Sequence, residues 1–271
     1  MMLGSRGGRQ RRNVLQGTWN WVLLMGLVLL AGCTTADGRV ASTAAEPLQV
    51  MVLATMHGAH ADNPRYSYDD VYALVNRFDP ALVAVEIRAE DLSRGEAYLA
   101  RNYPLEMREL ARRHAGHVAG IDWLGEELEG RPVPPDYWRE QSEIKRLERR
   151  LAQDSGMKSP ETDDAKERQL AIVETATAQA LNDGRYDRAS ADYYAAFARM
   201  VEGTDYQRLS DFYAERDRRI AGNAETLVAD MLARNEQPAR AVFVVGADHR
   251  GPLVAALQRR FGAAIELVPV P

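Results

Sequence analysis

The sequence predicts an α/β protein built on a mostly parallel central sheet that helices flank. Short, continuous apolar runs recur along the chain, and segments with helical periodicity separate them. Runs of this kind are typical of strands buried on both faces, as in a parallel sheet covered by helices. A long segment rich in Ala, Glu, Arg, Gln and Leu comes before the last apolar runs, and it predicts a helical cap inserted before the last strands.

Each predicted strand is a short apolar run, most of them rich in β-branched residues. The runs lie at 49–55, 81–85, 118–121, 241–245 and 264–268. Helices are predicted between them, at 67–78, at 91–114 with an interruption near Pro104, and at 252–261. Ser67 is a predicted N-cap because acidic residues and a helical apolar face follow it. The cap covers about 136–235 and is predicted to hold three or four helices.

The N-terminal region has the layout of a bacterial lipoprotein signal. Four arginines without a neighbouring acid precede an apolar run, and the small residues Ala31 and Gly32 then lead to Cys33. The apolar run is shorter than the about 20 residues that a membrane-spanning helix needs. We therefore interpret 1–32 as a cleaved signal peptide and Cys33, the only cysteine in the chain, as the lipid-bearing residue.

The predicted mature chain has three parts with different expected roles. The lipid on Cys33 is expected to anchor it to a membrane of the cell envelope. An Asp after the cysteine favours retention in the inner membrane, and Thr34 stands there instead, which resembles lipoproteins sorted to the periplasmic face of the outer membrane. Residues 33–47 are small and polar and are interpreted as a flexible tether. Residues 48–271 form a single α/β domain.

The charge of the mature chain excludes some classes of partner. Removal of 1–32 takes away four of the 34 basic residues and none of the 39 acidic ones, which leaves a net charge of −9. Nucleic acids and anionic lipid surfaces attract concentrated positive charge instead. We therefore expect no nucleic-acid partner.

Four predicted strands are followed by a residue that can bind a metal or transfer a proton. These residues are His57, Glu86, Asp122 and His249. In an open parallel sheet all strands point the same way, so these side chains should meet at the carboxyl edge, where α/β proteins place their ligands. The alternative for each one is structural, since a histidine after a strand is often only hydrogen-bonded and Glu86 could cap the next helix.

Two imidazoles and a carboxylate suit a divalent transition metal such as Mn, Co or Zn. We predict His57, Glu86 and His249 as the metal ligands, with Glu86 as ligand or general base. Asp122 is a possible additional ligand, and His60 is either a further ligand or a residue that only fills the loop. A metal of this kind lowers the pKa of bound water and polarises a carbonyl group, which is the basis of hydrolysis.

A second feature is the segment 215–223, with the sequence Glu-Arg-Asp-Arg-Arg-Ile-Ala-Gly-Asn. On a helix, Arg216, Asp217 and Asn223 fall on or beside the apolar face, where polar groups require partners. We predict that they face the site and that Arg216 holds a substrate carboxylate or stabilises an oxyanion. A structural Arg–Asp network that fixes this helix to the sheet is an equal alternative.

Four short motifs resemble the TraB/GumN/TIKI superfamily, with the erythromycin esterase-like and ChaN-like proteins as relatives. The family pattern has two Gly-x-x-His motifs, a glutamate at the end of the second strand and an arginine-led helix near the C-terminus. The second histidine motif is intact, whereas Ala54 takes the glycine position of the first, and Asp217 stands where several relatives have Asn. The motifs lie at 55–57, 85–86, 215–223 and 245–249.

The resemblance implies three possible activities. The TIKI branch implies a metal-dependent peptidase, the esterase-like branch implies hydrolysis by His and Glu without a metal, and the ChaN-like branch implies haem binding. Our hypothesis from the sequence is a membrane-anchored, metal-dependent hydrolase of a small-molecule or peptide substrate, with Glu86 and Arg216 as catalytic residues. The alternatives are a lipoprotein that binds haem or another small ligand without catalysis, and an inactive scaffold.

Overall fold

A computed structural model of the protein describes residues 46–234 and 239–271. The predicted signal peptide and Cys33 lie outside the described residues, and so does the predicted tether apart from Glu46 and Pro47. Across 46–234 and 239–271, no helix combines the length and the apolar character that crossing a membrane requires.

The described residues contain a five-stranded, all-parallel sheet, which confirms the predicted fold class. The strands lie side by side in the order β3-β2-β4-β1-β5. Each predicted strand is present, with ends that differ by a few residues at most. The strand bounds are β1 Leu48–Thr55, β2 Leu82–Val85, β3 Val118–Gly120, β4 Arg240–Gly246 and β5 Ile265–Leu267.

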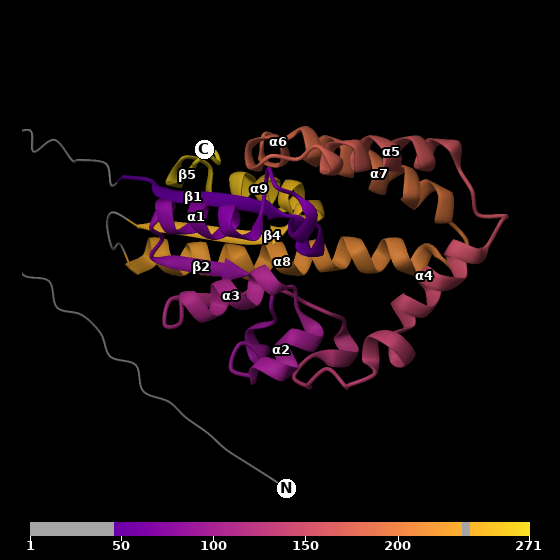
Figure 1. Ribbon diagram of the computed structural model, residues 1–271, viewed down its shortest axis with the longest axis horizontal. Helices are drawn as coiled ribbons and strands as arrows, with labels where there is room; N and C mark the ends of the chain where they lie inside the picture. The colour runs from indigo at the N-terminus through magenta and orange to yellow at the C-terminus, as the bar shows by residue number, and fades with distance from the viewer. Residues whose placement is uncertain (1–45, 235–238) are drawn as a thin grey trace, which may run out of the picture. The chain divides into compact units, whose positions relative to one another are not determined.

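Helices cover both faces of this sheet (Figure 1). One face carries α1 (Tyr68–Phe78) and α3 (Leu105–Arg113), and the other carries α8 (Gln207–Arg234) and α9 (Ala247–Phe261). The remaining α-helices are α2 (Glu96–Asn102), α4 (Glu143–Gln153), α5 (Pro160–Glu174), α6 (Ala178–Asn182) and α7 (Arg185–Val201). Shorter helical turns are η1 (His57–Asp62), η2 (Ala89–Asp91), η3 (Glu126–Leu128), η4 (Tyr137–Gln141) and η5 (Gly262–Ala264).

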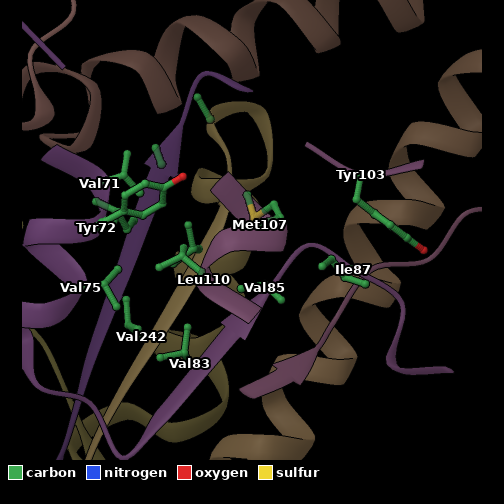
Figure 2. Packing of buried hydrophobic residues seen from close by; sticks show 14 of the residues in the cluster. Val71, Tyr72, Val75, Val83, Val85, Ile87, Tyr103, Met107, Leu110 and Val242 are labelled. Carbon is green, nitrogen blue, oxygen red and sulfur yellow. The ribbon is translucent and has the colours of Figure 1, made fainter. Parts of the chain in front are cut away.

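Helix α1 shows how local sequence sets these elements. Ser67 caps its N-terminus and forms a capping box with Asp70, as the sequence predicted for Ser67. The apolar residues of α1 then face the sheet, where Val71 and Val75 are fully buried with Val83 of β2 (Figure 2). The capping box fixes where α1 begins, and its apolar face fixes which side packs on the sheet. Together they hold α1 in one orientation.

The opposite face of the sheet has its own apolar layer. Ile220 and Val228 of α8 and Leu257 of α9 are buried there against Phe243 of β4. Neighbouring residues of one strand point to opposite faces, so Val242 belongs to the first layer and Phe243 to the second. Burial on both faces explains why the strands read as continuous apolar runs.

Two helix boundaries differ from the prediction. Helix α8 is not only part of the cap, because its second half packs Ile220 and Ala224 on the sheet, and the cap therefore consists of α4 to α7 and the first half of α8. Helix α9 begins at Ala247 instead of 252, so its first turn includes Asp248 and His249. An acidic residue in a first turn is favoured by the helix dipole, and Asp248 supplies it.

We predict opposite effects of the same substitution at two glycines. A Cβ at Gly120 would lie 2.4 Å from the carbonyl oxygen of Ile87, so Gly120→Ala should lower the free energy of unfolding by about 1–3 kcal/mol. A Cβ at Gly222, within α8, meets open space, so Gly222→Ala should raise it by up to about 1 kcal/mol. Urea unfolding followed by circular dichroism measures both, and an unchanged stability of Gly120→Ala would contradict the tight contact.

Candidate active site

The strands of the sheet end level with one another, which brings distant parts of the chain to one edge. Thr55 of β1 pairs with Gly246 of β4, and Val85 of β2 pairs with both Val244 of β4 and Gly120 of β3. The neighbouring strands β1 and β4 are followed by helices on opposite faces, α1 and α9. This arrangement opens the crevice at which α/β proteins bind their ligands.

The structure brings together the four residues that follow the predicted strands. Glu86 and Asp122 are buried, and both contact the same side chain on α8, which is Arg216. His249 lies 3.6 Å from Glu86, measured from Nε2 to Oε1. The ring of His57 packs on Gly246. A Cβ atom on Gly246 would lie only 2.7 Å from Nε2 of His57.

Arg216 is the centre of the site. Its Nη2 donates to Oε1 of Glu86 at 2.5 Å and lies 2.9 Å from Oδ1 of Asp122, to which Nε also donates at 3.0 Å. Its Nη1 donates to Nε2 of His249 at 3.0 Å. A guanidinium group has five N–H donors, so one N–H of Nη1 remains without a partner among the described residues.

The charges of this group shift one another's pKa. Burial alone would raise the pKa of Glu86, but His249, Arg216 and His57 outweigh it and hold that pKa well below the ordinary value. Burial and the charge of Glu86 raise the pKa of Asp122, although Arg216 opposes the rise. Glu86 also accepts from the backbone N–H of Gly246 at 2.6 Å. Glu86 is therefore the ionised partner of Arg216.

His249 is oriented from both sides. Its Nδ1 donates to Oδ1 of Asp217 at 2.5 Å, which leaves Nε2 to accept from Arg216. Burial lowers the pKa of His249, but Glu86 and Asp217 outweigh it, so the net shift is upwards. The side chain is only 14% exposed. His249 thus fixes the guanidinium of Arg216, and Asp217 fixes His249.

The structure adds a residue that the sequence did not point to, which is Glu106 in the first turn of α3. Its carboxylate is fully buried and accepts from Nδ1 of His57 at 2.8 Å and from the hydroxyl of Thr55 at 3.1 Å. A signal was present in the sequence, because Glu106 shares the buried face of α3 with Leu110, four residues later. A charged residue on an apolar face requires a partner.

The backbone at His57 aims its ring into the site. His57 has φ of +50°, which is uncommon for a residue other than glycine. The ring then lies above Gly246, where no side chain could fit, and 40% of the His57 side chain is exposed. Ala54, at the glycine position of the first motif, is accommodated within the buried part of β1.

Two of the predicted site residues have structural contacts instead. Both ring nitrogens of His60 are used by backbone groups, since Nε2 accepts from the N–H of Met56 at 2.8 Å and Nδ1 lies 2.7 Å from the carbonyl oxygen of Tyr66. No nitrogen of His60 is then left for a metal. Asn223 donates to the carbonyl oxygen of Ile121 at 3.0 Å, which ties α8 to the end of β3.

The side chains fit the predicted metal poorly as they stand. A cation shared by Glu86 and His249 would lie where the guanidinium of Arg216 now contacts both. Within 46–234 and 239–271, no group of three or more His, Cys, Asp or Glu side chains is placed to hold a metal ion. Binding a metal would require Arg216 to move, and the metal site remains a prediction from the sequence.

Asp248 connects the site to the cap. Its Oδ1 accepts from Gln169 of α5 and from Tyr186 and Ser190 of α7, and its Oδ2 accepts from Tyr194 of α7. The sequence motif contained Asp248, but its partners lie in the cap, whose packing the motif does not encode. Because Asp248 precedes His249, adjacent residues contact the cap and the side chains around Arg216.

Two pockets meet at the site and share His57, Tyr213 and Arg216. The cap pocket has a volume of about 290 Å³ and includes these residues of the cap side: Val173, Tyr186, Tyr194, Asp217, Asp248 and His249. The aromatic pocket has a volume of about 220 Å³ and includes these residues of the other side: Tyr103, Pro104, Leu124, Trp138, Ile144 and Phe212. A substrate that reaches both pockets must pass His57 and Arg216.

Comparisons of the chain with protein-family models, curated proteins and solved structures give no match. The resemblance to the TraB/GumN/TIKI superfamily therefore remains a prediction from the motifs. Function has to be inferred from the side chains of the site.

We predict that Glu106→Gln lowers the pKa of His57. Burial lowers this pKa, but Glu106 and Glu86 outweigh it and raise the pKa above the ordinary value of 6.5. A glutamine can still accept from Nδ1 but carries no charge. The titration of His57 followed by NMR measures the shift, and Glu109→Gln, on the same helix but paired with Arg112, is the matched control. An unchanged titration of His57 would contradict the pairing.

Proposed function

We propose that the domain is a hydrolase of esters or amides in which His57 is the general base. The observation that carries the proposal is the contact between Nδ1 of His57 and the buried carboxylate of Glu106. His57 lines both pockets, and its Nε2 has no hydrogen-bond partner among the described residues. A carboxylate on one ring nitrogen fixes the tautomer and the orientation of a catalytic imidazole. The raised pKa of His57 suits a base that works near neutral pH.

The proposed reaction moves one proton through His57. Nε2 takes a proton from a water molecule as the water oxygen attacks the carbonyl carbon of the substrate. The imidazolium that forms is stabilised by Glu106, and it then gives the proton to the leaving oxygen or nitrogen as the carbonyl–leaving group bond breaks. Water supplies the new hydroxyl group, so the products are an acid and an alcohol or amine.

Arg216 is proposed to stabilise the oxyanion that develops on the carbonyl oxygen. The N–H of Nη1 that has no partner within 46–234 and 239–271 is the proposed donor for this oxygen. Glu86, Asp122 and His249 hold the guanidinium before the substrate arrives, so little reorganisation is needed during the reaction. The charge of Arg216 is retained because Asp122 and Glu86 more than offset the effect of burial and raise its pKa.

A divalent metal remains the alternative means of activating water, as predicted from the sequence. The proposal based on Arg216 requires no metal, and the metal content of the active protein distinguishes the two proposals. If Arg216 performs this role, activity should survive dialysis against a chelator. If a metal does, elemental analysis of protein purified without chelators should find it, and a His57/His249 double variant should lose it.

We predict that His57→Gln lowers kcat by about 10²- to 10⁴-fold on the esters and amides that the protein hydrolyses, because the proton acceptor is lost. A panel of N-acetyl amino acid p-nitrophenyl esters and p-nitroanilides measures this. His117→Gln is the matched control, since His117 is exposed and outside both pockets. In the unchanged protein, kcat/KM should fall as the pH drops through the raised pKa of His57. In Glu106→Gln, the same fall of kcat/KM should occur at lower pH.

Two results would overturn the hydrolase proposal. The first is full activity of His57→Gln with any substrate of the panel. The second is no hydrolysis by the unchanged protein together with a Soret band on addition of haem that His57→Gln abolishes. The second result would support the alternative of a ligand-binding lipoprotein.

We also propose that the chain is attached to the cell envelope through lipid on Cys33. Cys33→Ser should abolish incorporation of labelled palmitate in a bacterial host and move the protein from the membrane fraction to the soluble fraction, since Cys33 is the only cysteine. Thr34→Ser is the matched control and should keep the label. Equal labelling of the Cys33→Ser chain would contradict the proposal.

A further inference from the structure

The aromatic pocket lies beside the proposed reaction centre and is built differently from the cap pocket. Its walls come from segments far apart in the sequence, namely α2 and the residues after it, η4, α4 and α8. Four of its side chains are aromatic, and further apolar surface comes from Leu124, Pro104 and Ile144. The aromatic side chains are Tyr103, Trp138, Phe212 and Tyr213.

These walls are fixed before any ligand binds. The indole N–H of Trp138 donates to Oδ1 of Asn102 at 3.1 Å, and Asn102 in turn donates to the carbonyl oxygen of Tyr98 at 2.9 Å. Phe212 stacks on Trp123 with the ring centres 5.6 Å apart. Rings held in this way lose little freedom when a ligand packs on them, which favours binding.

The pocket carries little net charge for a ligand to pair with outside the reaction centre. Its Lys145 and Glu148 pair with each other, with Nζ 2.8 Å from Oε2. Glu148 also accepts from the hydroxyl of Tyr213 at 2.7 Å. An uncharged group can enter without breaking these contacts. A charged group would lose its hydration, and the described lining residues outside the reaction centre offer it no unpaired charge.

The size of the aromatic pocket suits one side group and not a whole ligand. Its volume of about 220 Å³ is below the roughly 300–1,000 Å³ of pockets that hold an entire small ligand. Flat aromatic groups pack well between ring walls, by stacking and edge contacts. His57 and Arg216 are among its lining residues, so a group bound here lies close to the proposed reaction centre.

Resting on the proposed hydrolase function, we infer that the substrates are esters or amides with an uncharged aromatic group next to the scissile carbonyl, and that the aromatic pocket binds this group. The cap pocket then holds the other side of the scissile bond, where Tyr186, Tyr194 and Asp248 offer a polar surface. Selectivity depends on the residues of the aromatic pocket that take no part in proton transfer.

The test compares two esters that differ only in the side group, the p-nitrophenyl esters of N-acetylphenylalanine and N-acetylalanine. The unchanged protein should prefer the phenylalanine ester in kcat/KM by about 10- to 200-fold, the range that apolar pockets provide. Ile144→Trp fills the pocket and should lower this preference roughly ten-fold or more, mainly through KM. Leu170 lies on α5 outside both pockets and is 47% exposed, so Leu170→Trp should leave kcat/KM of both esters unchanged.

A second pocket variant and a binding measurement test the aromatic pocket without relying on the rate of hydrolysis. Trp138→Ala enlarges the pocket and should raise the KM of the phenylalanine ester while urea unfolding still shows a cooperative transition. Calorimetry should show that N-acetylphenylalanine, the acid product, binds to the His57→Gln protein. N-acetylalanine should bind to that protein more weakly. Adding Ile144→Trp to His57→Gln should remove the binding of N-acetylphenylalanine. An unchanged preference in both pocket variants would overturn the inference. Binding without hydrolysis by the unchanged protein would support the pocket and reject the proposed function.

Discussion

The site depends on one buried ion group, in which the guanidinium of Arg216 compensates two carboxylates at the edge of the sheet. Glu86 and Asp122 are nearly inaccessible to water, and removing water from a carboxylate is unfavourable by several kcal/mol unless a partner replaces it. Arg216 supplies that partner from α8, so the same contacts that hold the helix on the sheet also place a positive group beside His57 and His249. Structure and proposed chemistry therefore share one interaction.

Much of this arrangement could be predicted from the sequence because of the parallel sheet. Apolar runs with a polar residue directly after each one show where strands end, and parallel strands present their ends at one edge. This argument brought His57, Glu86, Asp122 and His249 together across nearly the whole domain. A second argument predicted Arg216 and Asp217 at the site, because polar residues on the apolar side of a helix need partners. The two interpretations of Arg216 were not exclusive, because it forms a buried network and faces the pockets.

The rest depended on packing between elements, which the pattern of one segment does not determine. The buried position of Glu106 on α3 indicated that it needs a partner, but the packing of α3 beside Thr55 and His57 decides which partner it has. His60 was predicted as a possible ligand from its residue type alone, but the turn after β1 points both of its nitrogens at backbone groups. The four donors to Asp248 come from cap helices whose sequence shows only helical periodicity. Hydrogen-bond partners across elements are thus the part that sequence reasoning misses.

The two histidines of the site have similar partners and different proposed roles, and burial explains the difference. Each donates from Nδ1 to a carboxylate, Glu106 for His57 and Asp217 for His249. The side chain of His57 is 40% exposed and lines both pockets, whereas that of His249 is 14% exposed and its Nε2 accepts from Arg216. His57 is therefore the more accessible of the two imidazoles. Under the proposed function, His57 is the base and His249 holds the guanidinium of Arg216 in place for the oxyanion.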